Sequence, residues 1–144
     1  MKKYLPMLLL LCAVAAFAAG CSDNGGRKTG SDGVDLDLSE LNDLLAYSQV
    51  VKILENPDDY LGKTIKVSGQ YYASYYAQTD SYYHFVVIGD ESACCLEGLE
   101  FKRSGDYAYP EDYPADGVRI DVIGVFERYT MLGNTYYRLS VTDA

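Results

Sequence analysis

Two neighbouring cysteines, Cys94 and Cys95, are the residues of this sequence with the clearest capacity for chemistry. Thiolates bind Zn²⁺ in tetrahedral sites together with histidine, and the only histidine, His84, lies ten residues earlier. Successive side chains of a strand point to opposite faces, so both sulfurs reach one ion only where residues 94–95 form a bulge or a turn. A zinc site made by Cys94, Cys95 and His84 is one hypothesis for the function.

The same cysteine pair permits two other interpretations. A disulfide between neighbours is strained, because adjacent Cα atoms lie about 3.8 Å apart and disulfides usually need about 4.4 to 6.8 Å. An oxidising location outside the cytosol would favour this bond. The simplest interpretation is that Cys94 and Cys95 are free thiols, buried as small hydrophobic side chains at the start of a strand. His84 would then be a strand residue with its own hydrogen bond. All three interpretations stay open.

The first residues, MKKYLPMLLLLCAVAAFAAGC, have the organisation of an export signal. Two lysines precede an apolar segment at residues 5–17, and small residues precede Cys21. The apolar segment is shorter than the roughly 18 to 20 residues that cross a bilayer. The pattern resembles the signal of bacterial lipoproteins. This resemblance implies cleavage after residue 20, a lipid anchor on Cys21 and a location at the extracytoplasmic face of the bacterial cell membrane.

Charge and motifs exclude several classes of function. The net charge is −9, and nucleic-acid binding depends on neutralising phosphates with lysine and arginine, so we expect no nucleic-acid partner. The sequence contains no glycine-rich phosphate loop, nucleophile elbow or metalloprotease helix. We therefore expect a protein that is not an enzyme.

The middle of the chain predicts a flexible segment followed by a helix. Residues 22–33 contain no hydrophobic side chain and are expected to be a flexible tether, and VDLDL after them alternates like a short extended piece. Ser39 is the expected cap of a helix with apolar residues at helical spacing up to Leu54, which ends at Asn56-Pro57. The predicted organisation is a signal peptide at 1–20, a lipidated cysteine and tether at 21–38, and one domain at 39–144.

After residue 62 the hydrophobic period changes from helical to two, which predicts strands at 62–72, 82–89, 96–102, 118–129 and 135–141. The first and fourth share the pattern Ile-x-Val-x-Gly-x-aromatic, with Gly69 and Gly124 at equivalent positions. A glycine within a strand marks a bend or a close approach of another backbone, and two long bent strands side by side allow a small barrel to close. The predicted fold is mainly β, a five-stranded OB-type barrel preceded by a helix.

Tyrosines supply the candidate binding surface. The chain has 15 tyrosines and no tryptophan, and many fall in YYASYYAQTDSYY between the first two strands. OB barrels bind ligands near this loop, and rings with polar tips can stack on a sugar or hold a peptide. The candidate ligand-binding residues are Tyr72, Tyr75, Tyr76 and Tyr82. The expected partner is an envelope protein or a glycan. We expect no cofactor, with zinc as the alternative.

Three segments carry a resemblance: ENPDDYLGKTIKVSGQYY, ACCLEGLEF and YPEDYPADGVRIDVIGVFERY. They are similar to segments of a group of uncharacterised lipoproteins from clostridia-type bacteria, and the similarity covers residues 47–144. The first segment is also similar to OB domains named after anticodon-binding proteins, which implies a fold and not a nucleic-acid ligand. We expect a membrane-anchored binding module, or alternatively a metal-binding or redox accessory lipoprotein that uses Cys94 and Cys95.

Overall fold

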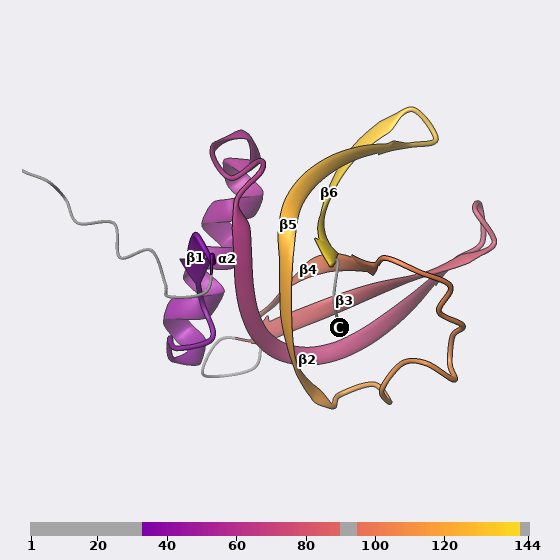
Figure 1. Cartoon of the computed structure of the whole chain (residues 1–144), viewed down its shortest axis with the longest axis horizontal. Coiled ribbons are helices and arrows are strands. Elements are labelled where there is room, and N and C mark those ends of the chain that lie inside the picture. The colour runs from indigo at the N-terminus through magenta and orange to yellow at the C-terminus, as the bar shows by residue number, and fades with distance from the viewer. Residues whose placement is uncertain (1–32, 90–94, 142–144) are drawn as a thin grey trace, which may run out of the picture.

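The computed structural model describes residues 33–89 and 95–141, and over these residues the chain is mainly β (Figure 1). One six-stranded mixed sheet is accompanied by one α-helix and a short 3-10 helix. In chain order the elements are β1 (Leu36–Asp37), α2 (Asp43–Glu55), η1 (Pro57–Asp59), β2 (Thr64–Tyr76), β3 (Ser81–Gly89), β4 (Leu96–Arg103), β5 (Arg119–Met131) and β6 (Asn134–Val141). The prediction of a mainly β domain preceded by a helix is confirmed. The predicted signal peptide, Cys21 and most of the tether lie outside the described residues.

The strands pair in the order β1-β2-β3-β4-β6-β5, and β5 also pairs with β2. The pairs β2–β3, β3–β4, β5–β6 and β2–β5 are antiparallel, whereas β4–β6 and β1–β2 are parallel. The pairing from β2 through β3, β4, β6 and β5 therefore returns to β2. Two hairpins extend from this sheet: β2–β3, which turns at residues 77–80, and β5–β6, which turns at residues 132–133.

The two strands with the repeated pattern lie side by side, as predicted. Gly69 of β2 pairs with Ile120 of β5, and Gly124 of β5 pairs with Ile65 of β2. The two copies of the pattern thus run antiparallel, with the isoleucine of each opposite the glycine of the other. Both strands are 13 residues long, so each contributes to the sheet and then continues into a hairpin.

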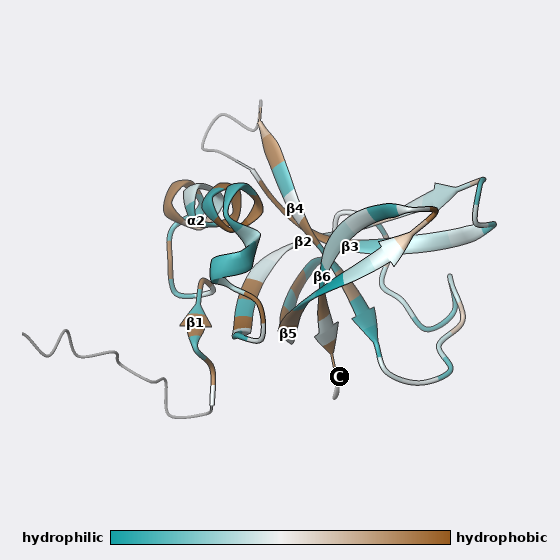
Figure 2. Cartoon of the chain, turned by 90° about the horizontal axis from the view of Figure 1, so that it is seen from above, coloured by the Kyte–Doolittle hydropathy of each residue, from teal (hydrophilic) through white to brown (hydrophobic). Residues whose placement is uncertain are grey.

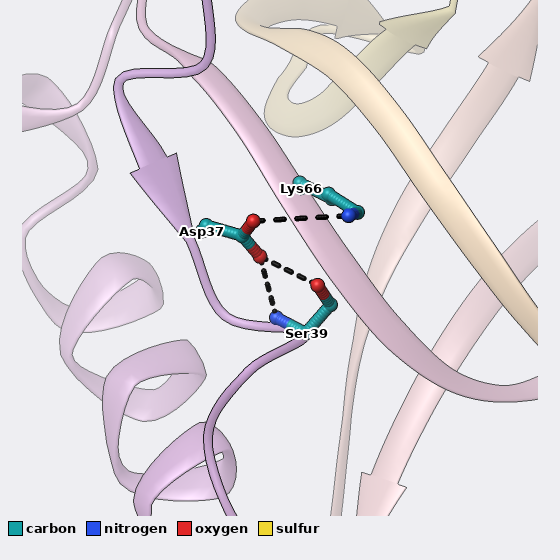
Figure 3. A network of polar contacts seen from close by, with 3 residues as sticks. All are labelled: Asp37, Ser39 and Lys66. Atoms are coloured by element: carbon teal, nitrogen blue, oxygen red, sulfur yellow. Dashed lines mark hydrogen bonds and ion pairs between the residues drawn. The ribbon is translucent and has the colours of Figure 1, made fainter. Parts of the chain in front are cut away.

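The helix begins later than the sequence analysis predicted. Asn42 caps α2, and its side-chain oxygen accepts a hydrogen bond from the Leu45 N–H at 2.9 Å. The predicted cap, Ser39, instead donates through its N–H (2.9 Å) and its hydroxyl (2.6 Å) to the carboxylate of Asp37 (Figure 3). The prediction that Ser39 caps the helix is wrong, because the Ser39 N–H and hydroxyl donate to the Asp37 carboxylate two residues earlier.

The chain joins the sheet before the predicted domain boundary at residue 39. Leu36 and Asp37 pair in parallel with Ile65 and Lys66 of β2, and the Lys66 ammonium lies 3.7 Å from the Asp37 carboxylate (Figure 3). Leu38 is buried, with 1% of its surface exposed. The last residues of the segment placed in the tether therefore pack with the domain.

The core lies between α2 and the curved sheet. Val50 and Ile53 of the helix are fully buried, as are Ile65, Tyr71 and Phe126 of the strands. Figure 2 shows hydrophobic residues on α2 and on the neighbouring parts of the sheet, while the end of the β2–β3 hairpin is mostly neutral or hydrophilic. No helix within residues 33–89 and 95–141 is both long and apolar enough to cross a membrane.

Candidate functional site: an aromatic groove between two hairpins

The residues predicted for a zinc site lie apart where the structure describes them. Cys94 is outside the described residues, and Cys95 directly precedes Leu96, which pairs with Gly89 at the end of β3. His84 pairs with Phe101, five residues from Gly89, or about 17 Å along an extended strand. Within the described ranges no three His, Cys, Asp or Glu side chains gather as a metal site. Cys95 is exposed, so the prediction of a buried thiol is wrong for this residue.

His84 lies in a stack of rings. Its Nδ1 is 2.7 Å from the Tyr71 hydroxyl, and its ring is parallel to that of Tyr113 at a centroid distance of 3.8 Å. Burial lowers the pKa of His84, which favours the neutral ring, and Nδ1 of this ring shares a hydrogen bond with the Tyr71 hydroxyl. Burial, followed by the charges of neighbouring phenols, raises the pKa of Tyr71. This arrangement is that of a packed strand residue with its own hydrogen bond.

The four candidate tyrosines lie on two faces of the β2–β3 hairpin. The Tyr75 and Tyr82 rings are 5.2 Å apart, and Tyr82 also contacts Tyr109 at 4.3 Å. Tyr76 belongs to the other face, where it meets the edge of Tyr83 at 6.3 Å. Tyr72 is 38% exposed, and its hydroxyl lies 3.3 Å from the Gln70 amide oxygen. The structure therefore brings Tyr75 and Tyr82 together and separates them from Tyr76.

The face with Tyr76 forms one wall of a cavity of about 430 Å³ between the two hairpins. Six aromatic side chains line it, and we call it the aromatic groove: Tyr76, Tyr83, Phe85, Tyr129, Tyr136 and Tyr137. Gly98 and Glu100 of β4 also line it. On the opposite wall the rings of Tyr129 and Tyr136 are stacked at 5.7 Å. The groove thus presents rings from both hairpins to one shared space.

A second cavity of about 370 Å³, the side pocket, adjoins the groove. The two cavities share four lining residues: Tyr83, Glu100, Tyr129 and Met131. The Tyr83 hydroxyl lies 2.8 Å from the Met131 sulfur and 3.1 Å from the Thr79 hydroxyl. This contact joins the two hairpins where the groove meets the side pocket.

Glu100 provides the charge in the groove wall, and Arg138, which lines the side pocket, lies next to the groove residue Tyr129. The Tyr129 hydroxyl donates to Glu100 Oε2 at 2.6 Å, and the Arg138 guanidinium lies 4.4 Å from the centroid of the Tyr129 ring. Burial raises the pKa of Glu100, although the Tyr129 hydrogen bond and the nearby cations oppose this shift. Burial and the bond to Glu100 also raise the pKa of Tyr129. The groove therefore combines ring faces with a fixed hydrogen-bonding group.

Of the six aromatic residues that line this groove, the sequence analysis named only Tyr76 as a candidate binding residue. Tyr129 and Tyr136 pair directly across the β5–β6 hairpin, and they flank a turn that the sequence does indicate. The signal was their placement on the same face of two adjoining strands, which period-two alternation specifies once the turn is fixed.

Comparison with known proteins does not assign this chain to a family. No protein-family model, no curated protein and no solved structure matches the chain. Function is therefore inferred from the groove and its residues.

Proposed function

We propose that this protein is a lipid-anchored, extracytoplasmic binding module of the OB type that holds an oligosaccharide in the aromatic groove. The strand order supports this fold. Counted from β2, the first and fourth strands are neighbours and the third and fifth pair in parallel, as expected for a five-stranded OB barrel.

The position of the aromatic groove is the observation that carries the proposal. OB barrels bind ligands on the face of the second and third strands, between the loop that follows the first strand and the loop that follows the fourth. The corresponding elements here are β3, β4 and the turns at 77–80 and 132–133. The groove is lined by Phe85, Gly98 and Glu100 of these two strands and by tyrosines of both hairpins.

Charge and ring chemistry select the class of ligand. OB barrels bind oligonucleotides and oligosaccharides at this face. A net charge of −9 opposes a polyphosphate chain. Tyrosine rings offer flat apolar faces with a hydroxyl at the edge, which suits a sugar ring with an apolar face and a hydroxylated rim. A peptide of an envelope protein is the competing occupant, and its capture in place of glycans would overturn the choice of ligand.

The anchor and the groove lie at opposite ends in this proposal. The described chain enters beside β1 and α2, away from the two hairpins (Figure 1). A lipid on Cys21 would attach the domain through this entry end. The groove would then face away from the membrane, toward polymers of the envelope.

A glycan array probed with the purified full chain tests the function. Tyr76→Ala and Tyr136→Ala each remove a groove ring, while Tyr75→Ala removes the neighbouring ring on the other face of the same hairpin. We expect each groove variant to bind about tenfold more weakly, which corresponds to roughly 1.4 kcal/mol, and Tyr75→Ala to bind like the unchanged protein. An array without bound glycan, or equal losses in all three variants, would reject the proposal.

The anchor is tested separately. Growth of an expressing bacterium with labelled palmitate should place label on the protein and leave Cys21→Ser unlabelled and released from the membrane. Membrane retention of the unlabelled variant would reject the lipid anchor.

A further inference from the structure

The side pocket is rich in cations although the chain is acidic. Lys102, Arg103 and Arg138 line it, and Glu100 is its only acidic lining residue. The residues that the structure describes contain eight lysines and arginines, so three of the eight gather at one cavity in a chain of net charge −9. This local excess of positive charge favours an anionic ligand.

Arg103 is the cation with the least compensation. Its Nε is buried and has no hydrogen-bond partner among the described residues, where the guanidinium donates from NH1 to the backbone carbonyl of Asp112, at 3.0 Å. The Asp112 carboxylate accepts a hydrogen bond from the Ala108 N–H instead. No ion pair to Arg103 occurs among residues 33–89 and 95–141. A buried guanidinium N–H normally donates to a hydrogen-bond acceptor.

The other two cations differ from Arg103. Arg138 donates through its Nε to Glu127 at 2.7 Å, so its charge is already compensated. Lys102 is exposed beside the cavity, with no ion pair among the described residues. Arg103 and Lys102 therefore supply the available positive charge.

Ring packing fixes the Arg103 guanidinium. Its Cζ lies 3.6 Å from the Tyr107 ring centroid and 5.8 Å from that of Tyr113. Rings against the face of a guanidinium leave its donors, which lie in its plane, for an acceptor. A planar carboxylate matches this fork. A doubly charged phosphate fits less well because Glu100 also lines the pocket.

We infer that the side pocket is a subsite for the carboxylate of an acidic sugar, bound by Arg103 and Lys102. The inference rests on the proposed function, because the sugar would belong to the oligosaccharide in the aromatic groove. The two cavities adjoin, because they share four lining residues. One oligosaccharide can therefore occupy both of them. The ligand class is thus an oligosaccharide that carries a uronic acid or a similar carboxylated sugar.

A tetrasaccharide that carries a single uronic acid residue and the methyl ester of the same tetrasaccharide are the matched probes, since they differ only in one charge and the ester group. Calorimetry with the full chain should give at least about tenfold tighter binding of the acid form, or roughly 1.4 kcal/mol. Arg103→Gln should abolish this preference, and Lys102→Gln should reduce it. Arg128→Gln is the control, because Arg128 pairs with Asp58 at an exposed site outside the pocket. Equal affinity for the two forms would overturn the inference, and so would a preference that survives in Arg103→Gln.

A second readout separates this inference from the proposed function. The Nε–H resonance of Arg103, assigned by its loss in Arg103→Gln, should shift to saturation with monomeric galacturonate and stay unchanged with its methyl ester. If Arg103→Gln unfolds, Lys102→Gln, at an exposed position, should weaken this titration. A saturating shift with a blank glycan array would support the carboxylate subsite and reject the oligosaccharide function. Binding of neutral glycans on the array, without a saturable shift of the Arg103 resonance, would support the oligosaccharide function and reject the carboxylate subsite.

Discussion

Gly69 lies directly against the backbone of Val87: a β-carbon added at Gly69 would be 2.6 Å from the Val87 carbonyl oxygen. The equivalent glycine of β5, Gly124, stands in the same relation to Ser140, with a distance of 2.9 Å. Contacts this short are excluded for any side chain. The two repeated glycines therefore lie where each long strand changes partner: β2 passes from pairing with β5 to pairing with β3, and β5 passes from pairing with β2 to pairing with β6.

Alanine at either glycine should destabilise the fold. The obstructing atoms belong to backbone, which cannot rotate away, so we expect Gly69→Ala and Gly124→Ala each to lose about 1 to 3 kcal/mol of unfolding free energy. Urea unfolding measures the loss. Gly98→Ala is the control, because its added carbon would meet the Val87 side chain at 3.2 Å, and it should lose less. Stability unchanged in Gly69→Ala would contradict this account of the close backbone approach.

The strands of the sheet could be predicted because burial of one face places hydrophobic residues at every second position, a pattern visible within each short segment of sequence. Ile65 and Val67 of β2 are fully buried and Val122 of β5 is nearly so, as their alternation indicates. The repeated glycine then indicated which two strands are neighbours. Helix capping could not be decided in this way, since Ser39 and Asn42 are both good N-caps and only the folded chain shows that Asp37 binds Ser39.

Asn42 should be the residue that stabilises the start of α2. Its side chain satisfies an N–H that the helix itself leaves without a partner. Replacement by alanine is expected to cost about 1 kcal/mol, whereas Asn42→Ser should retain most of the stability because a serine hydroxyl accepts the same bond. Urea midpoints of the two variants give the comparison. No loss in Asn42→Ala, or a loss in Asn42→Ser as large as that in Asn42→Ala, would contradict the capping role of this side chain.

His84 should make stability depend on pH. Its pKa is lowered in the folded state by burial, so the unfolded chain, with a histidine pKa of about 6.5, binds the proton more readily. The His84 contribution is thus fully present above about pH 6.5 and is lost as the pH falls below it. Glu100 acts in the opposite direction, because its pKa is raised, so a matched variant is needed.

His84→Gln supplies this comparison, since an amide can still form a hydrogen bond with the Tyr71 hydroxyl. Thermal unfolding between pH 7.5 and pH 5 should show a smaller decrease in Tm for this variant than for the unchanged protein. Parallel curves would mean that His84 does not titrate with unfolding.

The groove was only partly predictable, because residues adjacent in the sequence face opposite sides of the hairpin and residues far apart in the sequence line the same cavity. Tyr75 and Tyr76 are neighbours in the sequence, but strand alternation sends their rings to opposite faces. Tyr76 shares its cavity with Tyr136, sixty residues later. The cluster of tyrosines in the sequence thus pointed to one of the two hairpins that line the groove, while nothing within that cluster indicated which residues of the second hairpin would face it.

Asp37 should fasten β1 to the sheet. Burial by itself would raise the pKa of Asp37, but the hydrogen bonds from Ser39 and the charge of Lys66 together lower it. The stabilisation is therefore present above the unfolded pKa of about 3.9 and is lost as the pH falls through the lower folded value. The ion pair is partly exposed, so Asp37→Asn should cost only about 0.5 to 1 kcal/mol of unfolding free energy at pH 7.

The local effect on β1 should be larger than this global loss. The Leu38 N–H, which donates to the Lys66 carbonyl at 2.8 Å, should exchange with solvent faster in Asp37→Asn. Asp58→Asn, which removes a more exposed ion pair with Arg128, should leave this exchange unchanged. Equal protection of Leu38 in both variants would mean that β1 is held by its backbone pairing with β2 alone.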